Sequence, residues 1–251
     1  MISIIGNELY KIFRSKRIYI FLAILLVFSV GIAFLVSNIT PSEQISAQMI
    51  DMLKGPYFPA QILSIISDLL LPIFATLIIT FLISDEYDNG TLKLPLLHGF
   101  SRGRVIISKV IAGILVTVLM LLFVLIAAYG MGLLLWGSRV VDSGQFINTL
   151  KAYSLTVLPF ITLILLTAFI AILVKNSGIV IGVMVAIFVL GSFVSGVFPN
   201  VSTYLPTYYL KAFASSLDKI NYSRAFLVCG IYGVTAYAAA YLKFFRMEIQ
   251  K

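Results

Sequence analysis

Long apolar runs separated by short polar segments dominate this chain of 251 residues. A helix needs about 20 mostly apolar residues to cross the hydrocarbon core of a bilayer. The stretches that meet this length are residues 18–36, 62–83, 107–136, 153–174, 178–198 and 225–245. The pattern therefore predicts an all-α polytopic membrane protein, in which a single transmembrane domain of six helices occupies residues 1–251.

The first 17 residues carry a different pattern. Ile5, Leu9 and Ile12 recur at helical spacing, with Lys11 and Arg14 between them. A short helix with one apolar and one cationic face favours the membrane interface, where the cations meet lipid headgroups. We expect residues 1–17 to form an N-terminal amphipathic helix. We also expect the apolar run that follows to be retained, because it is too long for a signal peptide and no small-residue cleavage site follows it.

The amino-acid composition indicates that lipid, and not water alone, surrounds the folded chain. Hydrophobic residues make up 61% of the sequence and charged residues 11%, whereas soluble domains average about 45–50% and about 25%. With the N-terminus inside, 12 of the 18 Lys and Arg residues fall in inner segments and 6 in outer ones, as the positive-inside rule requires. This distribution predicts a multi-pass protein of the cell membrane with both termini in the cytoplasm. The net charge of +8 is then a topology signal, so lipid and not nucleic acid is the expected contact.

The segment after the second apolar stretch, residues 84–106, contains residues typical of a helix end, a turn and the start of a new helix. Asp85 and Glu86 form an acidic cluster where the span leaves the membrane. Asn89-Gly90 is typical of a turn, because glycine adopts a positive φ without steric cost. Thr91 can then cap a short helix. The sequence predicts a tight turn followed by a new helix on the cytoplasmic side.

That short helix, over residues 92–98, would present Leu96 and Leu97 on one side. Ser101 is placed to cap the next helix, which enters the membrane past Arg102 and Arg104. An exposed apolar surface of this kind binds a partner protein or lipid. Docking to a partner and resting on the bilayer are both compatible with the pattern.

The order of these features resembles the ABC type-2 permease family. In that family the second span ends in an acidic-x-x-x-Gly-Thr pattern, which Glu86, Gly90 and Thr91 match, and a basic segment like residues 101–104 opens the third span. Residues 8–14 are similar to the family's opening stretch. With the six-span layout, the resemblance covers essentially the whole chain.

The resemblance implies the permease subunit of an ATP-binding cassette exporter, in a bacterial cytoplasmic membrane. It implies partner ATPase subunits, a second permease chain that is identical or paralogous, and an amphipathic or hydrophobic cargo such as a peptide or drug. The residues it assigns to coupling with the ATPase are Glu86, Gly90, Thr91, Leu96, Leu97, Ser101, Arg102 and Arg104. No G-x-x-x-x-G-K-[ST] phosphate loop occurs in the sequence. ATP and Mg²⁺ are therefore expected on the partner chain, with no cofactor bound by this one.

Asp68 is an acid inside the second apolar stretch, about 15 residues and so about 22 Å from its cytoplasmic end. An ionisable group at that depth indicates a functional site, which here would line the cargo pathway or carry a proton. The plainer interpretation is a carboxylate near the outer interface, hydrated or hydrogen-bonded to a neighbouring helix. An ion- or proton-coupled transporter or channel using Asp68 is the alternative function. An intramembrane enzyme would need more clustered acids, and the single histidine, His98, excludes a site needing two. We predict no catalytic residue and no metal site.

Overall fold

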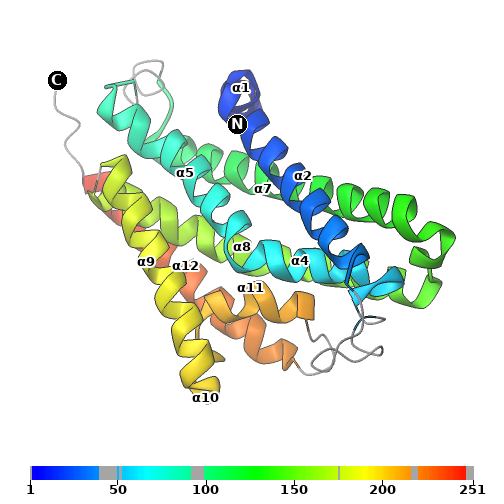
Figure 1. Cartoon of the computed structure of the whole chain (residues 1–251). Coiled ribbons are helices and arrows are strands. Elements are labelled where there is room, and N and C mark those ends of the chain that lie inside the picture. The colour runs from blue at the N-terminus through cyan, green and yellow to red at the C-terminus, as the bar shows by residue number, and fades with distance from the viewer. Residues whose placement is uncertain are drawn as a thin grey trace.

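The computed structural model describes residues 2–39, 50, 53–91, 99–174, 176–215 and 220–246, and the elements in this part of the chain are all helical (Figure 1). They are α1 (Ile2–Arg14), α2 (Lys16–Ser37), η1 (Gly55–Tyr57), α4 (Phe58–Asp68), α5 (Leu70–Asp88), α7 (Arg102–Trp136), η2 (Gly137–Val140), α8 (Ser143–Val174), α9 (Ser177–Val197), α10 (Pro199–Ser202), α11 (Pro206–Ser215) and α12 (Tyr222–Arg246). Within the described residues, α2, α5, α7, α8, α9 and α12 are long and apolar enough to cross a membrane. The predicted number of six spans and the all-α fold class are confirmed.

Helix α1 lies across one end of the bundle, where it packs against α7 and the start of α2 (Figure 1). Its apolar face buries Ile4 and Ile12, which are 4% and 3% exposed. Ser15 separates it from α2 and caps that helix by accepting a hydrogen bond from the Arg17 amide. The C-terminal end of α5 and the first turn of α7 lie at this same end, which we call the α1 end.

The second span, predicted as a single apolar stretch over 62–83, is broken. The helix stops at Asp68 and restarts at Leu70, and Leu69 between them has φ −139° and ψ −51°. Pro72 explains the position of the break, because a proline has no amide hydrogen to donate four residues back and its ring clashes with that carbonyl, here that of Asp68. The 19 residues of α5 rise about 28 Å, close to the about 30 Å of a hydrocarbon core. Asp68 therefore lies near the membrane boundary farther from α1.

Two short helices, α10 and α11, fill the connection between α9 and α12 (Figure 1). Helix α11 packs on α4 and α8, and it buries Tyr209 and Phe213 against Ala225 and Cys229 of α12. The segment is therefore folded into the bundle. This packing brings Lys211 of α11 to Asp68, whose Oδ2 lies 3.1 Å from the lysine Nζ.

Candidate functional site

A buried ion pair joins α1 to α7 at the α1 end. Glu8 lies midway between Ile4 and Ile12, at a spacing of four residues, so it is on the buried face of α1. It faces Lys109 of α7, and both side chains are 1% exposed. The Lys109 Nζ donates to both carboxylate oxygens of Glu8, at 3.1 Å each.

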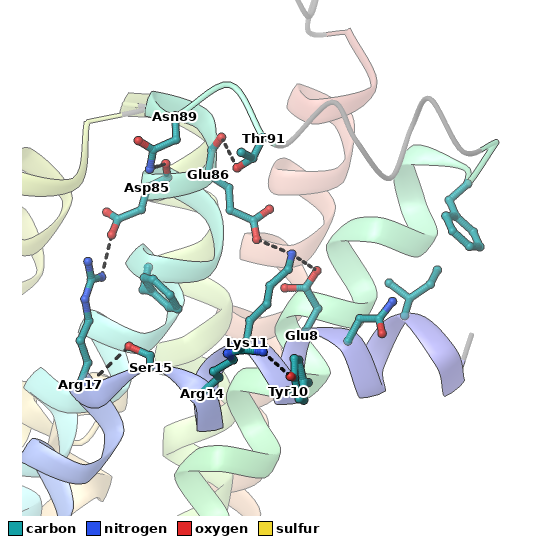
Figure 2. A pocket seen from close by; sticks show the side chains of 14 residues that line it. Glu8, Tyr10, Lys11, Arg14, Ser15, Arg17, Asp85, Glu86, Asn89 and Thr91 are labelled. Carbon is teal, nitrogen blue, oxygen red and sulfur yellow. Dashed lines mark hydrogen bonds and ion pairs between the residues drawn. The ribbon is translucent and has the colours of Figure 1, made fainter.

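Glu86, near the end of α5, extends this pair into a cluster. Its Oε2 accepts a hydrogen bond from Lys109 Nζ at 2.7 Å, and its Oε1 accepts one from Lys11 Nζ at 2.8 Å. Lys11 Nζ also lies 3.5 Å from Glu8 Oε1. We call Glu8, Lys11, Glu86 and Lys109 the charge cluster; Figure 2 shows three of them converging between α1 and α5. Two acids and two bases from three helices balance one another.

Burial makes the charges of this cluster costly to separate from one another. Moving an ion out of water costs several kcal/mol, and removing one partner of a buried pair typically costs about 3–5 kcal/mol because the other charge stays behind. Partial burial lowers the pKa of Lys11, but the carboxylates of Glu86 and Glu8 outweigh it and hold that pKa above its usual 10.5. A lysine whose pKa rises on folding stabilises the fold below its unfolded pKa and loses this effect only above pH 10.5. Lys11 therefore stays charged and paired throughout the physiological range.

A second ion pair ties the start of α2 to α5. Arg17 Nη1 donates to Asp85 Oδ2 at 2.7 Å, and its guanidinium lies 4.4 Å from the centroid of the Phe81 ring. The Arg17 and Asp85 side chains are 57% and 24% exposed. Exposed pairs contribute only about 0–1 kcal/mol, so this contact orients α2 more than it stabilises the bundle.

The turn after α5 is a Schellman cap. The Gly90 amide donates to Tyr87 O at 3.0 Å and the Thr91 amide to Glu86 O at 2.9 Å, the two bonds that define this motif. Gly90 has φ +68°, as the Asn-Gly pair predicted. The Thr91 hydroxyl also donates to Glu86 O, at 3.3 Å. The cap fixes the backbone of Glu86, one member of the charge cluster.

Of the other residues predicted to couple to the ATPase, three lie in the part of the chain that the structure describes and two lie outside it. Ser101 is the N-cap of α7, as predicted, but its side chain makes no capping hydrogen bond. Arg102 donates to the carbonyls of Phe244 and Phe245 at 3.3 and 3.1 Å, so it joins α7 to the end of α12; Arg104 is exposed. Leu96, Leu97 and the short helix over 92–98 lie outside the described residues, and their role stays a prediction.

An open cavity of about 890 Å³ lies beside the charge cluster. It is bounded by α1, the start of α2, the end of α5 and the segment before α7 (Figure 2). Its lining residues are Ile4, Asn7, Glu8, Tyr10, Lys11, Arg14, Ser15, Arg17, Phe81, Asp85, Glu86, Asn89, Thr91 and Phe100. Within the described part of the chain, no group of three or more His, Cys, Asp and Glu side chains could hold a metal ion. The cavity is open, and its lining carries both acidic and basic side chains.

Comparison with known proteins adds the family. A family model described as an ABC-2 family transporter protein matches residues 4–195, which is more than half of the chain. The chain belongs to the ABC-2 transporter family. It is thus a membrane component of a transporter, and the matched region includes the whole charge cluster. No curated protein matches the chain.

Glu8 and Lys109, at the centre of the charge cluster, were not identified as site residues from the sequence. Lys109 was counted only as a topology signal, and Glu8 only as part of the opening stretch that resembles the family. One signal was present: an acid on the buried face of an amphipathic helix, between two isoleucines, needs a buried partner. The partner lies 101 residues away, so the pairing itself required the fold.

Replacing Gly90 with Val should weaken the α5 cap. A β-branched residue at φ +68° costs about 1–2 kcal/mol, and the strain falls on the turn that holds Glu86. We expect a modest loss of thermal stability. With a partner ATPase of the kind that the resemblance implies, we expect that ATPase to stay bound while its hydrolysis is uncoupled from transport. Gly90→Asn is the matched control, because asparagine tolerates this backbone region. If both variants behave like the wild type in melting and in cargo-stimulated hydrolysis, the cap has no role in coupling.

Proposed function

We propose that this protein is the permease subunit of an ATP-binding cassette exporter, which moves an amphipathic or hydrophobic cargo with ATP hydrolysed on a separate ATPase chain. The observation that carries the proposal is the charge cluster, which ties α1, α5 and α7 together beside a cavity of about 890 Å³. Membership of the ABC-2 family supports the transport role.

The charge cluster gives a physical route for force. A push on α1 or on the segment between α5 and α7 acts on Glu8 or Glu86, and their buried partner Lys109 belongs to α7. Because separating buried charges is costly, the three helix ends move as one unit. Helix α7 has 35 residues and is about 52 Å long, so it carries the displacement across the membrane. The ATPase would dock at the α1 end, with Leu96 and Leu97 among its contacts.

A second permease chain completes the proposed transporter. One surface available to it is α9, where Gly182 is exposed and a Cβ added there would meet no described atom within 4 Å. Exposed small residues let the helix of another subunit approach closely. A small residue in a helix can serve packing within one chain or between two chains, and the open surroundings of Gly182 favour packing between chains.

The proposed orientation puts the α1 end in the cytoplasm of a bacterial cell. With Cys229, the single cysteine, replaced by serine, we expect a membrane-impermeant thiol reagent added outside to label Ser138→Cys and Asn200→Cys but not Asn89→Cys. All three native residues are exposed, and labelling after permeabilisation controls for reactivity. The reverse pattern would put the ATPase site on the wrong side and refute the proposal.

Photo-crosslinking tests where the ATPase docks. Tyr10 and Asn89 are exposed residues that line the cavity, and a benzophenone amino acid at either position should crosslink a protein that carries a phosphate-loop motif. The same probe at Asn200, far from α1, is the matched control. Crosslinks to such a protein from Asn200 but not from Tyr10 or Asn89 would place docking elsewhere and reject the proposed interface.

The broken second span favours one alternative, an ion- or proton-coupled transporter or channel. Interrupted helices often line ion sites, and Asp68 is the last residue before the break. Its side chain is 42% exposed and forms an ion pair with Lys211. The site therefore holds a pair with no net charge and not an unpaired buried acid. Transport that persists in proteoliposomes without ATP, and that needs an ion gradient, would select this alternative.

A further inference from the structure

Two adjoining cavities lie beside α11, away from the charge cluster, and the first of them reaches Asp68 at the helix break. The first has a volume of about 190 Å³, and its lining includes the polar residues Asp68, Ser192, Thr207 and Lys211. Its carboxylate and ammonium groups come from different helices, α4 and α11, and meet at 3.1 Å. The cavity therefore presents one negative and one positive charge side by side, among hydroxyl groups.

The second cavity has a volume of about 350 Å³ and is almost entirely apolar. It lies between α8, α9, α11 and α12, and its walls include Leu163, Met184 and Phe188. Leu190 at its edge is 62% exposed on a spanning helix, so the cavity opens towards the surface that faces acyl chains. Together the cavities fall within the about 300–1,000 Å³ range of small-molecule sites.

Gly191 and Thr207 line both cavities and join them. A Cβ at Gly191 would overlap the Thr207 hydroxyl, so only glycine allows this close approach of α9 and α11. Thr207 Oγ1 is buried and has no hydrogen-bond partner among the described residues. Buried hydroxyls are normally bonded, so this group is available to a ligand at the junction.

We infer that the two cavities together bind one phospholipid with a zwitterionic, primary-amine headgroup. Its ammonium group bonds to Asp68, its phosphate to Lys211, and an acyl chain enters the apolar cavity past Thr207. Charge complementarity selects the headgroup, and the opening towards the bilayer selects a lipid. The inference rests on the proposed function only in taking this site as part of the cargo pathway; binding itself requires no ATPase.

The existing ion pair does not block such a ligand. Asp68 and Lys211 are 42% and 54% exposed, and exposed pairs contribute little to stability. A zwitterion gives each residue a new partner of opposite charge, so no charge is left unpaired. A purely anionic lipid would leave Asp68 beside its phosphate, and a quaternary amine could not donate a hydrogen bond to the carboxylate.

Binding can be measured on the purified permease in maltoside micelles. The probe is lysophosphatidylethanolamine with a diazirine in its acyl chain, compared with the phosphatidylcholine and phosphatidylglycerol analogues. We expect it to bind about tenfold more tightly than either analogue, the effect of one hydrogen bond to a charged group. Its crosslinks should map to α8, α9 and α11.

The variants Asp68→Asn and Lys211→Gln should each remove this headgroup preference, and Lys211→Arg should retain it. Asp142→Asn and Lys151→Gln are matched controls, since neither residue lines the cavities. If a variant fails to fold, the headgroup series on the wild-type protein still decides. Equal binding of the three lipids, or crosslinks spread evenly over the spanning helices, would overturn the inference. Failure to find an ATPase partner would refute the proposed function and leave this result unchanged.

Discussion

Replacing Lys109 with Met should destabilise the protein by about 3–5 kcal/mol. The new side chain is similar in length but carries no charge, and it leaves the carboxylate of Glu8 buried, at 1% exposed, with only Lys11 Nζ 3.5 Å away. We expect α1 to detach from α7 so that the carboxylate of Glu8 can reach water. Thermal unfolding in detergent should shift down by several degrees. Trypsin should cut the variant after Lys11 or Arg14 faster than the wild type.

Two further variants test whether this effect is specific to the charge cluster. Lys151→Met removes an exposed lysine of α8 and should leave both measurements unchanged. The double variant Glu8→Met/Lys109→Met should recover part of the lost stability, because both buried charges leave together and Glu86 keeps Lys11. A single Lys109→Met variant that melts and digests like the wild type would show that the charge cluster does not hold α1.

Replacing both Leu96 and Leu97 with Asp should abolish ATPase binding. If the short helix over 92–98 seats these leucines in an apolar groove, their burial supplies roughly 3–5 kcal/mol before association costs. Two carboxylates in that groove would remove this and add a desolvation penalty. The permease should still insert and dimerise, because the charge cluster and the Gly90 cap lie outside the substituted segment. Co-purification of the ATPase with the variant measures the loss.

Leu96→Met/Leu97→Met is the matched control for that experiment. Methionine conserves apolar volume, so binding should persist. Crosslinking of the variant to the second permease chain, whether a copy of itself or a paralogue, checks that the two chains still associate. Full ATPase retention by the double Asp variant would move the main contact away from residues 92–98, onto α1 or another surface.

Local patterns in the sequence predicted most of the fold. Six apolar runs correspond to the six long helices, and the Asn89-Gly90 pair predicted the positive φ observed at Gly90. The break at Leu69 was not predicted, although Pro72 marks it four residues after Asp68. Leu69 and Leu70 are both apolar, so hydropathy alone does not reveal the interruption.

The sequence predicted only those parts of the candidate site that depend on residues close together in the chain. Glu86 was identified from its place in a short motif, but its partners Lys11 and Lys109 come from helices distant in sequence. The pairing of Asp68 with Lys211 depends in the same way on how α11 packs against α4. Such contacts between distant residues follow from tertiary packing, which no spacing rule within one helix encodes.

The composition of the complex purified from native membranes is the most direct test of the proposed function. We expect the affinity-tagged permease, extracted in mild detergent, to carry with it a protein containing a phosphate-loop motif and ATPase activity. We also expect a second permease chain, either a copy of this one or a paralogue. A permease that purifies alone, and that transports in proteoliposomes on an ion gradient without ATP, would contradict the proposed function.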